Sequence, residues 1–221
     1  MNKQQVPVIT LDGPSGTGKG TLCHRLADHL GWHFLDSGAL YRILAFVARK
    51  QEIAFSEIDQ LVSLAHGLKL RFGVANESGL VYIDGHEISH EIRTEQCGQD
   101  ASKAAAIPAV REALLARQRA FAVSPGLVTD GRDMGSVVFP DAILKIYLYA
   151  SPEERANRRY LQLKNIGNDV SLAQVIDELA ERDARDTTRS HSPLKPADDA
   201  ILVDTTGLTI DQVFDKVLQL V

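Results

Sequence analysis

The stretch that decides the fold is Val6-Pro7-Val8-Ile9-Thr10-Leu11-Asp12-Gly13-Pro14-Ser15-Gly16-Thr17-Gly18-Lys19-Gly20-Thr21. It joins an apolar run of strand length to a glycine-rich turn and a lysine that opens an amphipathic helix. The glycines let the backbone point successive N–H groups at a polyphosphate, and the positive end of the helix dipole adds to that field. The Lys19 ammonium would reach the terminal phosphates. A glycine-rich turn without a ligand is the alternative, but strand, lysine and helix are all in place for a phosphate-binding loop.

Composition narrows the class of protein. The chain has 221 residues, of which 44% are hydrophobic and 24% charged, and these are ordinary values for one sizeable globular domain. Its net charge of -5 argues against a broad nucleic-acid or membrane surface. Cys23 and Cys97 lack metal-ligand spacing and indicate reduced thiols, and no apolar run approaches membrane-spanning length. We expect an untargeted cytoplasmic monomer whose partners are small molecules.

The order of predicted elements indicates an α/β fold with a P-loop NTPase-like parallel sheet and helices on both faces. Apolar strands are predicted over 32–35, 127–130, 143–148 and 201–204, with amphipathic helices between them and two capping boxes at 151–154 and 171–174. From about Leu68 the pattern alternates around turn signals, which predicts a small antiparallel inserted subdomain over 67–106. Ligands of such folds bind at the carboxyl ends of the strands.

Three segments at those strand ends carry candidate chemistry. The first, 36–42, places Ser37, Tyr41 and Arg42 after the second strand. Arg42 would grip a phosphate, and Tyr41 would pack against a ring or bond a phosphate oxygen. An ordinary capped helix with a solvated arginine explains this segment equally well.

The second segment is Asp130-Gly131-Arg132-Asp133-Met134-Gly135, which follows a buried strand. An apolar run ending in aspartate resembles the second acidic motif of phosphate-loop enzymes, where a carboxylate lies near Mg²⁺. A salt-bridged turn is the alternative, but a strand end that faces the ligand crevice favours function.

The third segment, 181–189, places Arg182, Asp186 and Arg189 on one helical face. Two cations flanking a carboxylate would hold a phosphate and a sugar hydroxyl. On spacing alone, a solvated ion-pair helix that includes Glu178 is slightly favoured.

Over essentially its whole length the chain resembles the bacterial cytidylate kinases, within the nucleoside monophosphate kinases. The resemblance rests on the loop 13–21, in which Gly20 follows the lysine, and on 35–42, 91–94, 110–119, 130–135 and 181–189. It implies a core of residues 1–66, 107–150 and 191–221, an insertion at 67–106 on the nucleoside-monophosphate side, and a helical lid at 151–190.

The resemblance also implies residue roles. ATP would be bound by Gly13, Pro14, Ser15, Gly16, Thr17, Gly18, Lys19, Gly20 and Thr21. The nucleoside monophosphate CMP would be bound by Ser37, Tyr41, Arg42, Ser102, Arg111, Asp130, Arg132, Asp133, Arg182, Asp186 and Arg189. Among these, Ser102, Arg111 and Asp133 match positions that read cytosine, and Asp186 matches one that bonds the ribose. Lys19, Arg132, Arg182 and Arg189 would neutralise charge during transfer.

The expected activity is therefore phosphorylation of CMP and dCMP to CDP and dCDP by direct in-line transfer from ATP with Mg²⁺. The protein ligand of Mg²⁺ stays open, because Gly20 displaces the usual hydroxyl to Thr21 and the metal is then held mainly by phosphates and water. A kinase for shikimate or another nucleotide is the nearest rival, and the cytosine-reading set speaks against it. A GTPase-like switch is a rival of another class, but the chain has no guanine-reading N-K-x-D motif after a strand. A nonenzymatic relative would not need the intact lysine and arginines.

Overall fold

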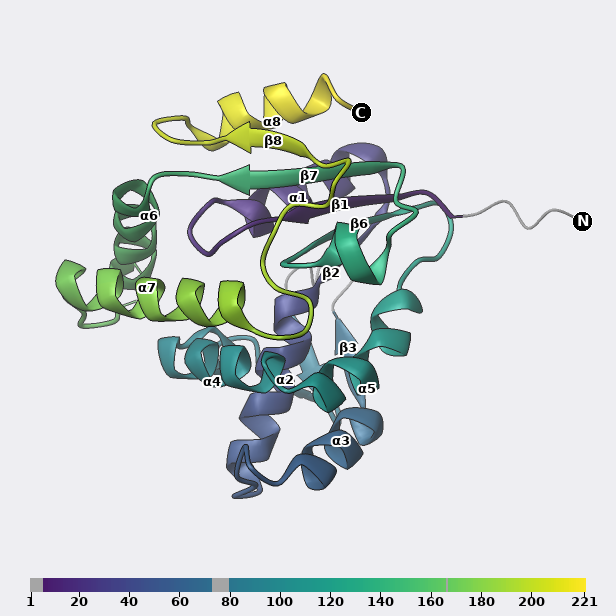
Figure 1. Ribbon diagram of the computed structural model, residues 1–221, viewed down its shortest axis with the longest axis vertical. Coiled ribbons are helices and arrows are strands. Elements are labelled where there is room, and N and C mark those ends of the chain that lie inside the picture. The colour runs from purple at the N-terminus through teal and green to yellow at the C-terminus, as the bar shows by residue number, and fades with distance from the viewer. Residues whose placement is uncertain (1–5, 73–79, 166) are drawn as a thin grey trace, which may run out of the picture. The chain divides into compact units, whose positions relative to one another are not determined.

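A computed structural model of the chain describes residues 6–72, 80–165 and 167–221 (Figure 1). The chain forms two compact units, one of residues 1–37 and 118–221 and the other of residues 38–117. No helix among the described residues is long and apolar enough to cross a bilayer.

The first unit is built on a five-stranded sheet whose order is β2-β6-β1-β7-β8. Every neighbouring pair of its strands is parallel, as predicted. The strands are β1 (Val8–Asp12), β2 (His33–Asp36), β6 (Leu127–Gly131), β7 (Leu144–Tyr149) and β8 (Ile201–Asp204). All five residues of β1 are buried, which explains its nearly continuous apolar sequence at the centre of the sheet.

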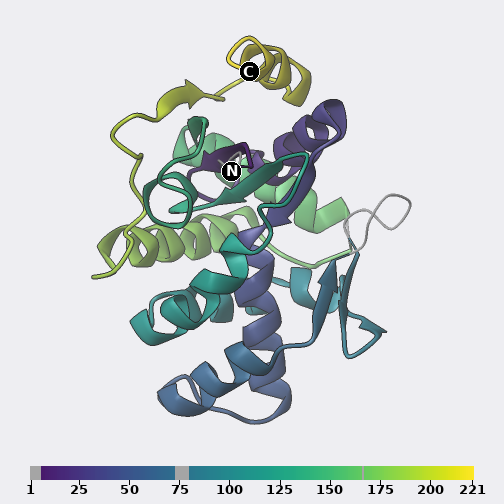
Figure 2. The ribbon, with the colours of Figure 1, turned by 90° about the vertical axis from the view of Figure 1, so that its right-hand side faces the viewer.

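The helices of the first unit cover this sheet and extend from it. They are α1 (Lys19–Leu30), the short helical segment η3 (Met134–Val138), α6 (Pro152–Asn165), α7 (Leu172–Thr188) and α8 (Ile210–Leu218). Helices α1 and α8 lie side by side on one face, where Leu22 and Leu26 of α1 and Val217 of α8 are fully buried (Figure 2). Segment η3 packs on the other face, so that a Cβ on Gly135 would lie 2.8 Å from the Thr10 hydroxyl oxygen.

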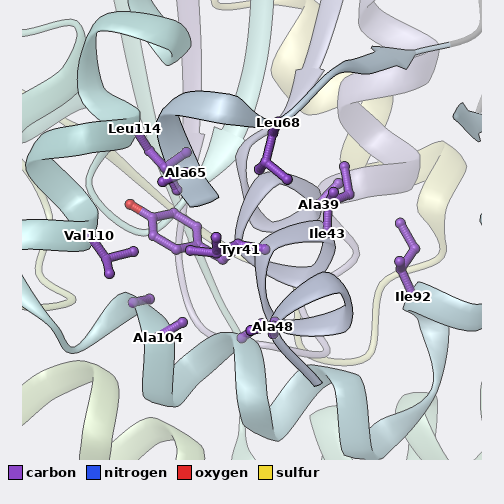
Figure 3. Close-up of a cluster of buried hydrophobic side chains, with 14 of the residues drawn as sticks. Ala39, Tyr41, Ile43, Ala48, Ala65, Leu68, Ile92, Ala104, Val110 and Leu114 are labelled. Atoms are coloured by element: carbon purple, nitrogen blue, oxygen red, sulfur yellow. The ribbon is translucent and has the colours of Figure 1, made fainter. Parts of the chain in front are cut away.

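The second unit surrounds α2, which spans Ser37–Lys50 and is mostly apolar. Its other helical elements are α3 (Ile58–Gly67), η2 (Glu91–Arg93), α4 (Glu95–Ala105) and α5 (Pro108–Arg119). Its core is a cluster in which Tyr41 points from α2 toward Val110 and Leu114 of α5 (Figure 3).

The predicted antiparallel strands are confirmed in this unit. They are β3 (Leu70–Phe72), β4 (Val81–Ile83) and β5 (His86–Glu87), paired antiparallel in the order β3-β4-β5. One of the turn signals of this segment, at residues 76–79, also predicts a turn, but it lies outside the described residues. The segment 67–106 thus belongs to a larger unit that also holds most of α2, α3 and α5.

Candidate functional site

The loop after β1 has the geometry of a phosphate-binding loop. Gly18 has a positive φ of 87° and α1 begins at the next residue, Lys19. At the start of the loop, Gly13 has a φ of 140°, and a Cβ there would come within 2.0 Å of the Leu148 carbonyl oxygen of β7. Only glycine fits this position, because the loop turns against the backbone of a neighbouring strand.

The Lys19 side chain is buried within this loop and folds back on it. Its Nζ donates hydrogen bonds to the Pro14 carbonyl at 2.6 Å and to the Thr17 hydroxyl at 3.3 Å. Burial lowers the pKa of Lys19 from its usual 10.5 to about 7, and the nearby charge of Arg132 acts in the same direction. An incoming polyanion would supply the countercharge that this ammonium needs. Thr21, which the sequence offers in place of the usual hydroxyl, is exposed.

Carboxylates gather at the ends of the strands beside the loop. Asp36 of β2 and Asp130 of β6 are paired in the sheet register, and Asp12 ends β1 next to them. Burial and the negative charge of Asp36 raise the pKa of Asp130 to about 8. The Asp130 Oδ1 atom is buried and has no hydrogen-bond partner, and its Oδ2 atom lies 3.8 Å from where a Cβ on Gly20 would stand.

The carboxylates of Asp36 and Asp130 fit a hard divalent cation. Mg²⁺ in kinases is held by one or two carboxylates together with waters and substrate phosphates. The buried Asp130 Oδ1 atom, which has no hydrogen-bond partner, would supply such a ligand. In the part of the chain that the structure describes, no three His, Cys, Asp or Glu side chains are arranged so that they could hold a metal ion together, so substrate phosphates and water would have to complete the coordination.

Arg132 connects the end of β6 to the loop and to α7. Its Nη2 donates to the Ser15 hydroxyl at 2.8 Å and its Nε donates to Asp186 Oδ2 at 2.9 Å. Burial opposes ionisation of Asp186, but Arg132, Arg182 and Arg189 outweigh it and hold the pKa of that carboxyl below its usual value. Asp186 is only 3% exposed, so the solvated ion-pair interpretation of this helix face is wrong for this residue.

Arg182 and Arg189 lie at the same site. The charge of Arg182 lowers the pKa of both Lys19 and Asp186, as expected for a cation on the α7 face nearest the loop. Helix α7 ends at Thr188, one residue before Arg189. The Arg189 guanidinium is nevertheless buried, with Nη2 3.9 Å from Asp133 Oδ1.

The remaining candidate residue of this unit, Ser37, lies under the turn after β6. It is buried, and its Oγ would be 2.5 Å from a Cβ on Gly131. The structure therefore brings Ser37, Asp130, Arg132 and Asp133 to one end of the parallel sheet, beside the phosphate loop.

Four candidates belong to the unit of residues 38–117. Arg42 donates to the carbonyl oxygens of Ile92 at 2.9 Å and Thr94 at 3.2 Å. The Arg111 guanidinium lies 5.6 Å from the centre of the Tyr41 ring, and both side chains are buried. Ser102 is buried on α4. Tyr41 is thus a core residue that supports Arg111.

Four residues of the site were not singled out by the sequence. They are Asp12, Asp36, Arg155 and Asp183. Arg155 of α6 donates to Asp183 of α7 at 2.6 Å and to the Ser15 carbonyl at 3.2 Å, which ties both helices to the loop. Asp12 and Asp36 each end an apolar strand run, and this sequence signal could have identified them. No sequence pattern pairs Arg155 with Asp183, because the two residues are 28 positions apart.

Comparison with known proteins identifies the family. A family model described as cytidylate kinase matches residues 9–221. The chain belongs to the cytidylate kinase family. A cytidylate kinase from Nitrosococcus oceani is 57% identical over 217 residues, covering 97% of this chain and 96% of that one. Another from Stutzerimonas stutzeri is 57% identical over 215 residues, covering 96% and 94%.

Among solved structures, an uncharacterized protein from Eubacterium ventriosum is similar in fold alone. Its TM-score is 0.53 at 10% identity, and the match covers 98% of each chain. Family membership confirms the predicted resemblance and the enzyme class, a phosphotransferase of the kinase type. The roles of individual residues stay predictions.

The raised pKa of Asp130 predicts a pH-dependent effect of Asp130→Asn on stability. Between pH 3.8 and about 8 the folded chain keeps a proton that the unfolded chain has released, so the free energy of unfolding of the wild type falls as pH rises. The free energy of unfolding of Asp130→Asn does not fall in this way, because asparagine does not titrate. The advantage of the variant over the wild type, measured by urea unfolding in metal-free buffer, is expected to grow by a few kcal/mol between pH 5 and pH 8, at about 1.4 kcal/mol per pKa unit.

Thr129→Ser, a buried neighbour on β6 without a titrating group, is the control and should change stability equally at both pH values. An Asp130→Asn effect of the same size at pH 5 and pH 8 would contradict the raised pKa.

Proposed function

We propose that the protein transfers the γ-phosphoryl group of ATP to CMP or dCMP and releases ADP with CDP or dCDP. The observation that carries the proposal is the hydrogen bond from Arg132 to Ser15 of the phosphate loop. Arg182 and Arg189 lie close to the same site, because both lower the pKa of Asp186, the partner of Arg132. One cation-rich site beside a phosphate loop suits two phosphorylated substrates. Membership of the cytidylate kinase family names the acceptor.

The donor site is the loop of residues 13–21. Its backbone N–H groups and the start of α1 would hold the polyphosphate, and Lys19 would leave the Pro14 carbonyl to bind the terminal phosphates. Mg²⁺, held by the phosphates with Asp130 and Asp36, would neutralise charge on the transferred group.

The acceptor phosphate would be bound by Ser37, Arg42, Arg132 and Arg182. Asp186 now pairs with Arg132, and it would bond ribose hydroxyls once the nucleotide arrives. This exchange costs little, because a phosphate replaces the carboxylate as the partner of the same guanidinium. Arg189 would lie between the sugar and the transferred phosphoryl group.

The base would be read by Ser102, Arg111 and Asp133. Cytosine presents an amine donor next to a ring nitrogen and a carbonyl acceptor, so a carboxylate and a guanidinium complement its edge. Buried polar partners that are left unpaired reject the wrong base. The Tyr41 ring, whose centre lies 5.6 Å from the Arg111 guanidinium, would help to orient that side chain.

The chemical step needs alignment and charge neutralisation. The acceptor is already a phosphate oxyanion, so a general base is dispensable. Lys19, Arg132, Arg182 and Arg189 would stabilise the negative charge that spreads over the transferred group in a loose transition state.

Two segments complete the proposal. Residues 67–106 would form the part of the enzyme on the nucleoside-monophosphate side, and residues 151–190 would form a lid that excludes water from the bound pair. Helices α6 and α7 of this lid pack on each other through Ala156, Leu163, Val175 and Leu179. The Arg155–Asp183 ion pair links them to Ser15 of the loop.

The activity is tested by ADP release from Mg-ATP in the presence of a panel of nucleoside monophosphates. CMP and dCMP are expected to stimulate ADP release strongly, and AMP and GMP are not. Lys19→Ala is the control for a contaminating kinase and should remove the stimulation by orders of magnitude. Stimulation by another monophosphate but not by CMP or dCMP would contradict the proposal.

The base-reading role of Asp133 predicts a change of acceptor preference in Asp133→Asn. The variant keeps the shape of the buried side chain but replaces one acceptor oxygen by a donor, which suits uracil better than cytosine. The ratio of kcat/KM for CMP over UMP should fall by about tenfold or more, as expected for a hydrogen bond to a charged group. Asp141→Asn, at an exposed position of the same unit, is the control. Equal losses for CMP and UMP would reject the role.

A further inference from the structure

Asp12, the last residue of β1, is a buried carboxylate that the proposed reaction does not use. Its Oδ1 accepts a hydrogen bond from the Met134 backbone N–H at 2.9 Å, and its Oδ2 accepts one from Gly135 at 2.8 Å. These two residues begin η3, directly after Arg132 and Asp133. These two hydrogen bonds do not join the Asp12 side chain to the phosphate loop. They join it to the start of η3, directly after the acceptor-binding candidates Arg132 and Asp133.

The first N–H groups of a helical segment have no partner within it, so a buried start requires an outside acceptor. A carboxylate with two oxygens can satisfy two such groups at once. Burial raises the pKa of Asp12 to about 6, and the two N–H bonds oppose that rise. An ionised Asp12 is therefore the form that fits this arrangement.

The same segment fixes the backbone of Asp133. The Asp133 carbonyl accepts hydrogen bonds from Val137 at 2.9 Å and Val138 at 3.2 Å, so this residue is part of the turn that Asp12 anchors. Gly135 lets the turn lie directly on β1, since a Cβ there would meet the Thr10 hydroxyl oxygen at 2.8 Å. The position of Asp133 is thus set by β1 through a short chain of contacts.

We propose that Asp12 is a positioning residue for the acceptor nucleotide: its carboxylate anchors Met134 and Gly135 and thereby aims Asp133 and Arg132 at CMP. This inference rests on the proposed function. It assigns Asp12 to the acceptor side even though its neighbour in sequence, Gly13, begins the donor loop.

The test is the Asp12→Asn variant, with KM measured separately for CMP and ATP. The amide offers one acceptor oxygen where the carboxylate offers two, so its NH₂ group faces one of the two backbone donors. We expect KM for CMP to rise about tenfold, equivalent to about 1.4 kcal/mol, while KM for ATP stays within about twofold.

The matched control is Thr10→Val. Thr10 lies two positions before Asp12 on the same face of β1 and is also buried, but its hydroxyl oxygen has no hydrogen-bond partner. This variant changes packing under η3 without removing an anchor, and both KM values should stay at the wild-type level. Equal increases of KM for CMP and ATP in Asp12→Asn, or no increase for CMP, would overturn the proposal.

If Asp12→Asn does not fold, hydrogen–deuterium exchange of the wild type tests the proposal instead. The amides of Met134 and Gly135 should exchange slowly with solvent deuterium in the nucleotide-free protein, and exchange as fast as that of an open loop would overturn the proposal. The outcomes are distinct from failure of the proposed function, which would show as a wild type that CMP does not stimulate.

Discussion

The candidate site is built on acidic and basic side chains that are buried where β1, β2 and β6 end. Asp12, Asp36 and Asp130 lie there beside Lys19, and the parallel register brings them together. Low solvent exposure disfavours each charge separately, which raises the pKa of Asp130 and lowers that of Lys19. An unliganded site of this kind is electrostatically incomplete. In the proposed reaction, a polyphosphate with its metal ion would supply the missing charges of both signs.

Two arginines around this centre, Arg132 and Arg155, are held by hydrogen bonds to neighbouring groups. Arg132 is partnered by Asp186 and by Ser15 of the loop, so its guanidinium is already oriented before a substrate arrives. A guanidinium held this way would lose little conformational freedom when the proposed substrates bind, and such preorganisation would favour catalysis. The bond from Arg155 to the Ser15 carbonyl links α6 directly to the loop, and the Arg155–Asp183 ion pair links α6 to α7.

Local signals in the sequence were sufficient to predict the phosphate loop, α1 and the parallel sheet. Helix α1 begins at Lys19, as the glycine-rich loop followed by a lysine predicted, and Gly31 ends it in the left-handed conformation. Long-range pairing was not accessible from spacing. Asp186 looked like part of a solvated stripe because its partner, Arg132, lies 54 positions away. Asp12 could have been noticed as the end of an apolar strand run, but its hydrogen bond to Met134, 122 positions later, could not be predicted from spacing.

With its pKa lowered to about 7, Lys19 would be largely uncharged at pH 8 and would gain a proton when the proposed donor nucleotide binds. Calorimetric titration of the enzyme with metal-free ATP at pH 8, in buffers of different ionisation enthalpy, measures that proton directly. We expect net uptake approaching about one proton per ATP, because phosphates beside Lys19 would raise its pKa from about 7. The uptake should be lost in Lys19→Arg, because arginine is always charged. ATP binding without proton uptake, or the same uptake in Lys19→Arg, would contradict this account.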